Sequence, residues 1–190
     1  MRKYKLTEET ISYMVKTLYR IEAVRDFGDV KAGDRGGYIE KEDNLSHSGD
    51  CWVSGDAQVS GNAWVFDNAK VSDNALVYGD ALVSGYAQVS GNAQVSGNAK
   101  VSGNAEIGSD ADYICLKGFG SKNRNTTMFR CKDGAVFVVC GCFEGTLDEF
   151  AAQVKQTHGN NKYGKEYGLC VDLAKAHFGA SSVSASGNEV

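Results

Sequence analysis

The chain has 190 residues, a length that suits one or two small domains. Its net charge of −4 gives no attraction to a phosphate backbone, and no run approaches the ~20 apolar residues of a membrane span, so we expect no nucleic-acid partner and no membrane partner. Six cysteines without a secretory signal predict reduced thiols and a cytoplasmic location.

Residues 1–49 are predicted to form an N-terminal β cap and the segment that leads into a repeat. Residues 4–6 and 13–27 have the pattern of strands, with a turn expected around residues 8–11. The Gly36–Gly37 pair that follows is not a phosphate loop, because no Gly-Lys-Ser/Thr comes after it. We expect this part of the chain to close one end of the repeat, since stacked repeats need capping segments.

From Val53 to Ile107, valine or isoleucine recurs at every sixth residue, ten times in succession. Two positions before each lies a small residue, which is cysteine in the first hexad and alanine in the other nine. Residues two apart in an extended segment point to the same side, so each hexad has an apolar pair that it cannot bury alone. Turn tripeptides such as Ser-Gly-Asn separate the pairs. The pattern predicts a solenoid over residues 50–111.

The spacing resembles the hexapeptide-repeat family of left-handed parallel β-helices. The family signature is an aliphatic residue followed four positions on by a small one, as from Val53 to Ala57. The resemblance implies three strands and about 18 residues per coil, hence just over three coils. The left hand is implied by the family resemblance alone, since the ordinary rule for crossover connections favours the right hand.

Upstream of the repeat the hexad phase weakens. Counted back from Val53, Ile39 and Leu45 fall on the small-residue phase, and Lys41 and His47 fall on the valine phase. Lysine and histidine are poor core residues, so regular coiling is predicted to begin near Cys51.

The residue between each small residue and the following valine is predicted to point outward. Stepping by 18 groups these positions on three faces: Trp64, Leu82 and Lys100; Gln58, Leu76 and Gln94; Trp52, Lys70, Gln88 and Glu106. An exposed apolar cluster usually marks a contact surface. The alternatives are a surface covered by flanking segments of the same chain, a subunit interface, and a surface that binds a ligand or lipid. Since hexapeptide-repeat proteins are commonly trimers, the resemblance implies a homotrimer with these interface residues: Trp64, Phe66, Leu76, Tyr78, Leu82 and Tyr86.

Residues 112–179 are predicted to form a small C-terminal α+β domain in the order β-β-β-α-α. A strand over 113–119 precedes a hairpin of 126–132 and 135–143, which turns at Asp133-Gly134. A capping box at 146–149 begins a helix that Gly159 ends, and a second helix covers 164–178. Residues 180–190 are predicted to be a disordered tail. The fold class is therefore mainly β, a capped left-handed β-helix with a C-terminal α+β domain.

Catalytic and metal chemistry find little support in the sequence. Hexapeptide-repeat acyltransferases use a histidine as general base, and His47 is the candidate because the repeat itself contains none. Cys140 or Cys142 could act as a nucleophile with His158 as its general base, but the sequence shows no third residue that would complete a catalytic triad. The cysteines lack the Cys-x-x-Cys spacing of a zinc site, so neither a metal nor a cofactor is expected.

The polar loop over residues 120–127 is the preferred small-molecule site. Lys122 and Arg124 are predicted to anchor a phosphate or carboxylate, with Thr126 and Thr127 as hydrogen-bond donors. The alternative is an ordinary solvated connection between two strands.

The layout of the whole chain resembles uncharacterised proteins of bacteriophages and prophages. There, a stretch like residues 25–30 precedes the repeats and a stretch like residues 140–150 follows them. This resemblance implies the cytoplasm of an infected bacterium but no known activity. The predicted function is a non-enzymatic binding or assembly protein, acting as a counter-defence factor that binds a host protein or sequesters a nucleotide-like molecule. The alternatives are an acyltransferase and a purely structural phage component.

Overall fold

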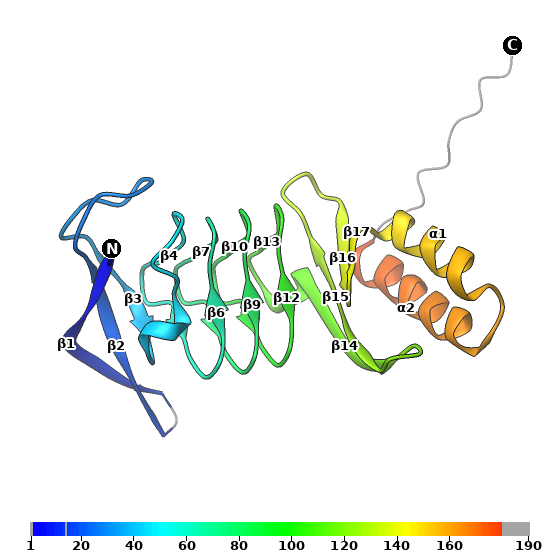
Figure 1. The fold of residues 1–190 in the computed structure, drawn as a ribbon, viewed down its shortest axis with the longest axis horizontal. Coiled ribbons are helices and arrows are strands. Elements are labelled where there is room, and N and C mark those ends of the chain that lie inside the picture. The colour runs from blue at the N-terminus through cyan, green and yellow to red at the C-terminus, as the bar shows by residue number, and fades with distance from the viewer. Residues whose placement is uncertain (1, 14, 180–190) are drawn as a thin grey trace, which may run out of the picture.

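The structure, a computed structural model, describes residues 2–13 and 15–179. A β-hairpin end, a stack of coils and an α+β end follow one another along the long axis (Figure 1). The predicted tail over residues 180–190 lies outside the described residues. Among the helices described, none is long and apolar enough to cross a membrane.

The middle of the molecule is a parallel β-solenoid, as the hexad pattern predicts. Every hexad supplies one strand of two residues, and strands 18 residues apart pair in parallel. The first sheet contains β4 (Trp52–Val53), β7 (Lys70–Val71), β10 (Gln88–Val89) and β13 (Glu106–Ile107). The second contains β5 (Gln58–Val59), β8 (Leu76–Val77) and β11 (Gln94–Val95), and the third contains β6 (Trp64–Val65), β9 (Leu82–Val83) and β12 (Lys100–Val101). The three predicted outward faces are therefore confirmed.

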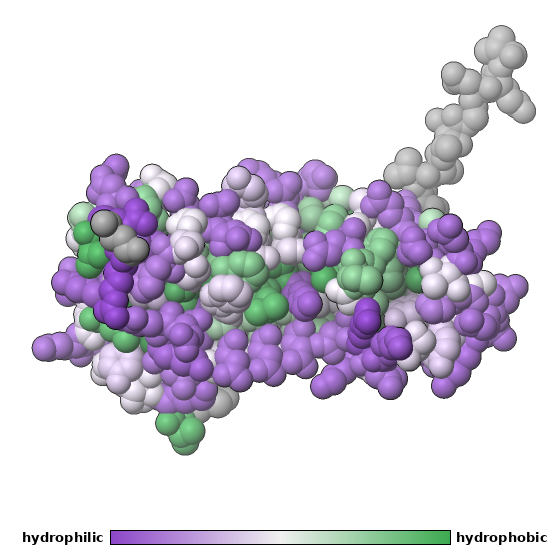
Figure 2. Space-filling view, in the orientation of Figure 1, coloured by the Kyte–Doolittle hydropathy of each residue, from purple (hydrophilic) through white to green (hydrophobic). Residues whose placement is uncertain are grey.

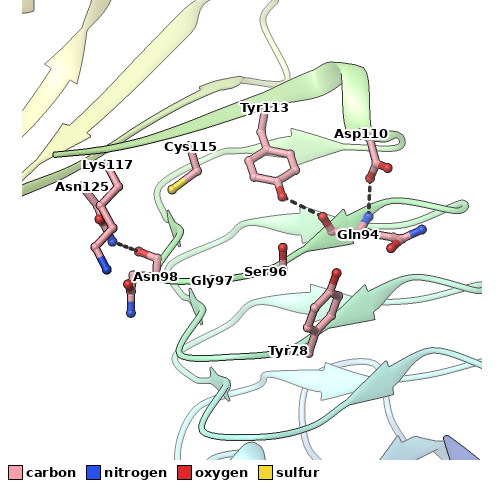
Figure 3. Close-up of a pocket in the computed structure, with 10 residues that line it drawn as sticks. All are labelled: Tyr78, Gln94, Ser96, Gly97, Asn98, Asp110, Tyr113, Cys115, Lys117 and Asn125. Carbon is pink, nitrogen blue, oxygen red and sulfur yellow. Dashed lines mark hydrogen bonds between the residues drawn. The ribbon is translucent and has the colours of Figure 1, made fainter. Parts of the chain in front are cut away.

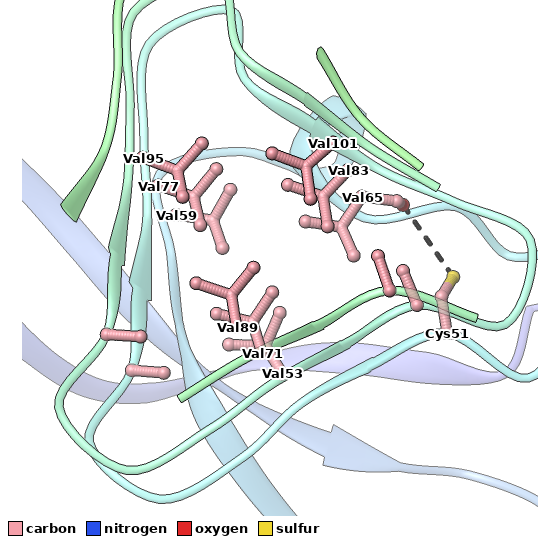
Figure 4. Packing of buried hydrophobic residues seen from close by; sticks show 14 of the residues in the cluster. Cys51, Val53, Val59, Val65, Val71, Val77, Val83, Val89, Val95 and Val101 are labelled. Carbon is pink, nitrogen blue, oxygen red and sulfur yellow. Dashed lines mark hydrogen bonds between the residues drawn. The ribbon is translucent and has the colours of Figure 1, made fainter. Parts of the chain in front are cut away.

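The solenoid interior consists of stacked valine and alanine side chains (Figure 4). The hexad valines and alanines are all at most 1% exposed. Backbone rungs join consecutive coils, for example from Trp64 N to Ala81 O at 2.9 Å and from Phe66 N to Val83 O at 3.0 Å. Each coil thus buries its apolar pairs against its neighbours and satisfies its backbone groups in the same step.

The solenoid has about four coils, one more than the strict hexad count suggests. Ile39 pairs with Val59, and Leu45 forms a bridge with Val65, so both occupy valine positions. The prediction that coiling begins near Cys51 is wrong because Leu45 and Val53 are eight residues apart rather than six. The extra pair of residues shifts the phase without ending the stack. The Asn44 side chain closes this irregular coil by donating to Ala63 O at 2.8 Å.

The N-terminal part is an antiparallel hairpin that continues one solenoid sheet. β1 (Tyr4–Tyr13) pairs with β2 (Lys16–Ala23), β2 pairs with β3 (Arg35–Ile39), and β3 pairs in parallel with β5. The turn expected around residues 8–11 is wrong, because these residues lie within β1 at a shift of its register. The reversal comes after Tyr13 instead.

The C-terminal sheet has four antiparallel strands rather than the three predicted. They are β14 (Tyr113–Phe119), β15 (Arg124–Arg130), β16 (Val136–Cys140) and β17 (Phe143–Thr146). The hairpin at Asp133-Gly134 is confirmed. The fourth strand arises because Gly141, with φ of +67°, reverses the chain within the predicted 135–143 strand.

The two predicted helices are present and pack on this sheet. α1 (Leu147–His158) begins at the Thr146 cap, whose hydroxyl accepts from Glu149 N, and ends before Gly159. α2 (Lys162–Phe178) ends at Gly179, which is left-handed with φ of +64°. Met128, Val138 and Cys140 face these helices, while Phe129 and Val139 on the other face join the solenoid core. The sheet is therefore both a cap for the last coil and a base for the helical pair.

A pair of corner glycines gives a test of coil stacking. Gly79 and Gly97 both have positive φ, but a Cβ on Gly79 would lie 3.0 Å from the backbone of Gly97, whereas a Cβ on Gly97 would meet nothing within 4 Å. We expect Gly97→Ala to cost about 1 kcal/mol from backbone strain and Gly79→Ala roughly twice that, because the neighbouring coil must also move. Urea unfolding with unchanged m-values measures both, and equal losses would contradict coil contact at this corner.

Candidate functional site

The site that holds most of the predicted functional residues is a cavity beside the helical pair. Its volume is about 370 Å³, and we call it the Arg124 cavity. Its polar wall includes Ser121, Lys122, Arg124, Gln153, Thr157 and His158. The thiol-bearing and apolar part of the lining comprises Cys140, Cys142, Phe143, Phe150, Val154 and Tyr167. The loop cations and the Cys140/Cys142–His158 group, which the sequence left as separate candidates, thus meet in one place.

The β14–β15 loop reaches the cavity because it is fixed to α2. Gly120 N donates to Glu166 Oε2 at 3.0 Å. A Cβ on Gly120 would overlap the Tyr167 ring, so only glycine permits this approach. The contact places Lys122 and Arg124 over the opening between the sheet and the helices.

The Arg124 guanidinium lies at the rim of the cavity. It passes over Gly141, where a Cβ would collide with it. Within residues 2–13 and 15–179, neither Arg124 nor Lys122 makes a side-chain hydrogen bond or an ion pair, and both are exposed. Two unpaired cations at the rim of a hollow are a suitable arrangement for a carboxylate or phosphate.

The floor of the cavity is aromatic and largely fixed. Phe150 lies between Phe143 and Tyr167, with ring centroids 5.2 Å and 5.5 Å away. The His158 ring stacks on Tyr167 at 5.8 Å. Burial, followed by the hydrogen bond to Cys140, raises the pKa of Tyr167, so its hydroxyl remains protonated at neutral pH.

Thr126 and Thr127 do not act as donors beside Lys122, contrary to the expectation from sequence. They lie within β15, where successive side chains point to opposite faces, and both are at most 1% exposed. Thr126 Oγ1 donates to Cys140 Sγ at 3.2 Å on the helix side. Thr127 Oγ1 accepts from Lys100 N at 3.0 Å on the solenoid side. Both hydroxyls therefore have structural partners, and Thr127 also lines a hollow on the solenoid side together with Arg124.

A second cavity, of about 620 Å³, lies between the last coils and the C-terminal sheet. Arg124 and Cys142 line both cavities, and Lys100 and Asp80 contribute on the solenoid side. The Asp80 carboxylate already accepts from Asn62 and Asn98 at 3.1 Å and 3.0 Å. The cations Lys100, Arg124 and Lys122 thus extend along neighbouring hollows, a feature that the sequence alone did not reveal.

A third cavity, of about 590 Å³, opens where β14 passes over the solenoid (Figure 3). Tyr113 donates from its hydroxyl to Gln94 O at 2.7 Å, and Asp110 Oδ1 accepts from Gln94 N at 2.7 Å. Asn125 Nδ2 donates to Asn98 O at 3.1 Å. These hydrogen bonds complete part of the last coil. Tyr78 and Lys117 also line the cavity, and their side chains make no hydrogen bond or ion pair among the described residues.

His47, the candidate base for acyl transfer, packs inside the N-terminal part. Its ring stacks on Tyr4 at 4.3 Å, and Nδ1 accepts from Lys3 N at 3.3 Å. Nε2 is buried and has no hydrogen-bond partner among the described residues. Desolvation lowers the pKa of His47, so the ring is neutral but does not offer an accessible nitrogen to a substrate. His47 lines none of the cavities described above.

None of the six predicted interface residues is buried, whereas Trp52, on another outward face, is covered by the N-terminal part. Trp52 is only 5% exposed because Tyr4 and Phe27 of the N-terminal part pack edge-on against it. Trp64 is 42% exposed, stacks on Phe66 at 4.2 Å and pairs with Leu82 in the next coil. Hydrophobic residues accordingly appear at the middle of the solenoid face in Figure 2. Leu76 lies on the adjacent sheet, and Tyr86, 67% exposed, lies at a turn on the other side.

No group of three or more histidine, cysteine, aspartate or glutamate side chains suited to a metal occurs in the part of the chain that the structure describes. All six cysteines are free thiols, and Cys142 is the exposed one.

The repeat has recognisable relatives. Residues 69–85 and 75–91 match the family model described as YdcK Beta solenoid repeat. Together with the stacked two-residue strands, this decides the nature of the repeat. The protein is a hexapeptide-repeat β-solenoid. It is also similar to the "Uncharacterized acetyltransferase YdcK" of Escherichia coli (strain K12), with 39% identity over 61 residues. That match covers 28% of this chain and 19% of the relative, so the similarity concerns a short part of that protein.

Proposed function

We propose that the protein is a binding protein for a small anion that carries a flat apolar group, such as a nucleotide. The observation that carries this proposal is the Arg124 guanidinium, unpaired among the described residues, at the edge of an aromatic-lined cavity. The solenoid serves as a rigid support that holds this cavity at one end.

The two walls of the Arg124 cavity suit the two parts of such a ligand. Phe143, Phe150 and Tyr167 supply apolar surface against which a base can pack. Lys122 and Arg124 supply charge-assisted hydrogen bonds to a phosphate. The cavity volume of about 370 Å³ lies within the range of ~300–1,000 Å³ that is usual for small-molecule sites.

A chain of phosphates would extend from this cavity toward the solenoid. Arg124 borders both hollows, and Lys100 lies on the far side of the second one. Three cations in succession favour a diphosphate over a single phosphate, because each further charge gains its own partner.

Loss of Arg124 tests the proposal. We expect ADP to bind more tightly than inorganic pyrophosphate, and Arg124→Ala to weaken ADP binding about 10- to 100-fold, as one charge-assisted interaction predicts. Lys165→Ala removes an exposed cation of α2 that does not line the cavity and should leave binding unchanged. Isothermal titration calorimetry measures the affinity of the unmodified protein for ADP and for pyrophosphate, and the affinity of each variant for ADP. Failure of ADP to bind at millimolar concentration, or equal binding by Arg124→Ala, would contradict the proposal.

Acyl transfer is the second candidate, favoured by the similarity to a protein named as an acetyltransferase. Coenzyme A contains a nucleotide diphosphate and so suits the same cations. The accessible histidine beside them is His158 rather than His47, since the latter's Nε2 is buried. A thioester turnover assay with acetyl-coenzyme A separates the two functions. Acyl transfer requires thiol release that is lost in His158→Ala, whereas the binding function gives no turnover in either protein.

The exposed cluster of Trp64, Phe66 and Leu82 supports the proposal of a homotrimer. A bulky aromatic pair that no segment within residues 2–13 and 15–179 covers is a suitable centre for a subunit contact. The setting that we propose, on the resemblance in layout, is a bacterial cytoplasm in which a phage protein sequesters a nucleotide signal. If the protein is instead a purely structural phage component, its role depends on this subunit contact and not on the Arg124 cavity.

Charge reversal at the cluster tests this contact. We expect Trp64→Glu to convert the trimer to monomers, because a buried unpaired carboxylate costs more than such an interface can supply. Gln88→Glu, at an exposed outward position on another face, should preserve the trimer. Native mass spectrometry gives the subunit number, and a monomeric unmodified protein would contradict the proposal.

A further inference from the structure

Lys3 is a buried lysine that has no acidic partner among the described residues. Its side chain is 0% exposed, and its ammonium makes no ion pair within residues 2–13 and 15–179. Instead, Nζ donates to Cys51 O at 2.8 Å and Gly49 O at 3.2 Å, and lies 4.9 Å from the centroid of the Phe27 ring. It also lies 3.2 Å from Cys51 Sγ. Burial of an ammonium group is costly unless it is hydrogen-bonded, and here backbone carbonyls take the place of a carboxylate.

Cys51 is also unusual, because it interrupts the repeat. The other nine hexads have alanine at this position, where the side chain points into the coil. The thiol of Cys51 projects into the same interior, 0% exposed, beside Val65 (Figure 4). The hexad that departs from alanine is therefore the one that meets the buried lysine.

We propose that Lys3 and Cys51 form an oxidation-dependent covalent cross-link between the N-terminal part and the first coils of the solenoid. The oxidant is hydrogen peroxide. This proposal rests on the contact between the two side chains and is independent of the function of the Arg124 cavity.

The chemistry balances in two steps. The thiol and one peroxide give a sulfenic acid and water, so that sulfur loses two electrons and gains one oxygen. The neutral amine of Lys3 then attacks that sulfur and a second water leaves, which forms an S–N bond with the net loss of two hydrogens. A second peroxide can insert oxygen into this bond and release water, which gives an N–O–S bridge. A thiol reductant returns the free amine and thiol.

The surroundings favour the second step over the first. Desolvation by burial lowers the pKa of Lys3, which increases the fraction of neutral, nucleophilic amine. Burial likewise raises the pKa of Cys51, so its first oxidation is slow and needs local opening of the structure. Once formed, the sulfenic acid has the amine beside it and little access to other thiols.

The cross-link would fix the N-terminal sheet to the solenoid. It would close a loop from residue 3 to residue 51, and loop closure stabilises a protein chiefly by restricting its unfolded chain. We expect the melting temperature to rise by roughly 5–10 °C on oxidation, in line with a bond of disulfide type in a chain of this length.

Peptide mapping of the full-length protein tests the proposal. After peroxide treatment and alkylation without reduction, we expect a linked pair of peptides containing Lys3 and Cys51. Its mass should be ~2 Da below the sum of the free peptides, or ~14 Da above it for the oxygen-bridged form, and reductant should release both. Cys51→Ala, which restores the residue of the other hexads, should abolish the linked pair and the rise in melting temperature.

Lys3→Met provides a second variant that keeps the thiol and removes the amine. It should yield Cys51 carrying ~16 Da or ~32 Da and no linked peptides. The proposal is wrong if the unmodified protein gives these oxidised, unlinked forms, or if Cys51 stays reduced after the exposed Cys142 has been fully oxidised.

Discussion

Each coil depends on the next one for its backbone hydrogen bonds, and this dependence shapes the rest of the structure. A two-residue strand cannot persist alone, yet strands 18 residues apart form continuous parallel ladders. The ladders end abruptly at the last coil, where unpaired N–H groups would otherwise remain. The C-terminal segment supplies acceptors there: Asp110 Oδ1 for Gln94 N and Thr127 Oγ1 for Lys100 N. The cap is thus needed to pair the N–H groups of the last coil as well as to cover its apolar side chains.

The candidate site is a consequence of that cap. One face of the C-terminal sheet seals the solenoid and the other supports α1 and α2, so Arg124 at the start of β15 lies at the edge between two hollows. The same strand provides Thr127, which accepts from Lys100 N of the last coil, and Arg124, which borders both hollows. The candidate site and the seal at the end of the solenoid therefore share one strand.

The sequence specifies the solenoid because its period is regular and each position has a single environment. It specifies α1 for a local reason, since the Thr146 and Glu149 side chains cap the helix within one turn. It does not reveal the added coil, because the two extra residues before Val53 move Ile39 and Leu45 out of phase while leaving them in the stack. The spacing of six residues from Ile39 to Leu45, the same as in the hexads, was the sequence feature that could have indicated the added coil.

The candidate site was predictable only in part. Lys122 and Arg124 are conspicuous in a polar stretch, but the strand that begins at Arg124 buries Thr126 and Thr127 on opposite faces. The cavity itself depends on the approach of Tyr167 to Gly120, a contact between residues far apart in the chain. No local sequence pattern predicts that contact. Buried Lys3 likewise appears as one charge among many until the fold brings it to Cys51.

Because every regular coil contains 18 residues, the number of coils sets the length of the solenoid. Successive coils lie about 4.8 Å apart with their corners aligned, so each added or removed coil changes the length of the protein by one fixed step. Removal of residues 76–93 would join Ala75 to Gln94 and preserve the alternation of inward and outward positions. The hairpin end and the Arg124 cavity would then approach each other by one coil spacing. The lining of the Arg124 cavity would be unchanged, and Asn62 would take the place of Asp80 in the second cavity. The distance between the two ends of the molecule is thereby an adjustable quantity in this architecture, separate from the chemistry of either end.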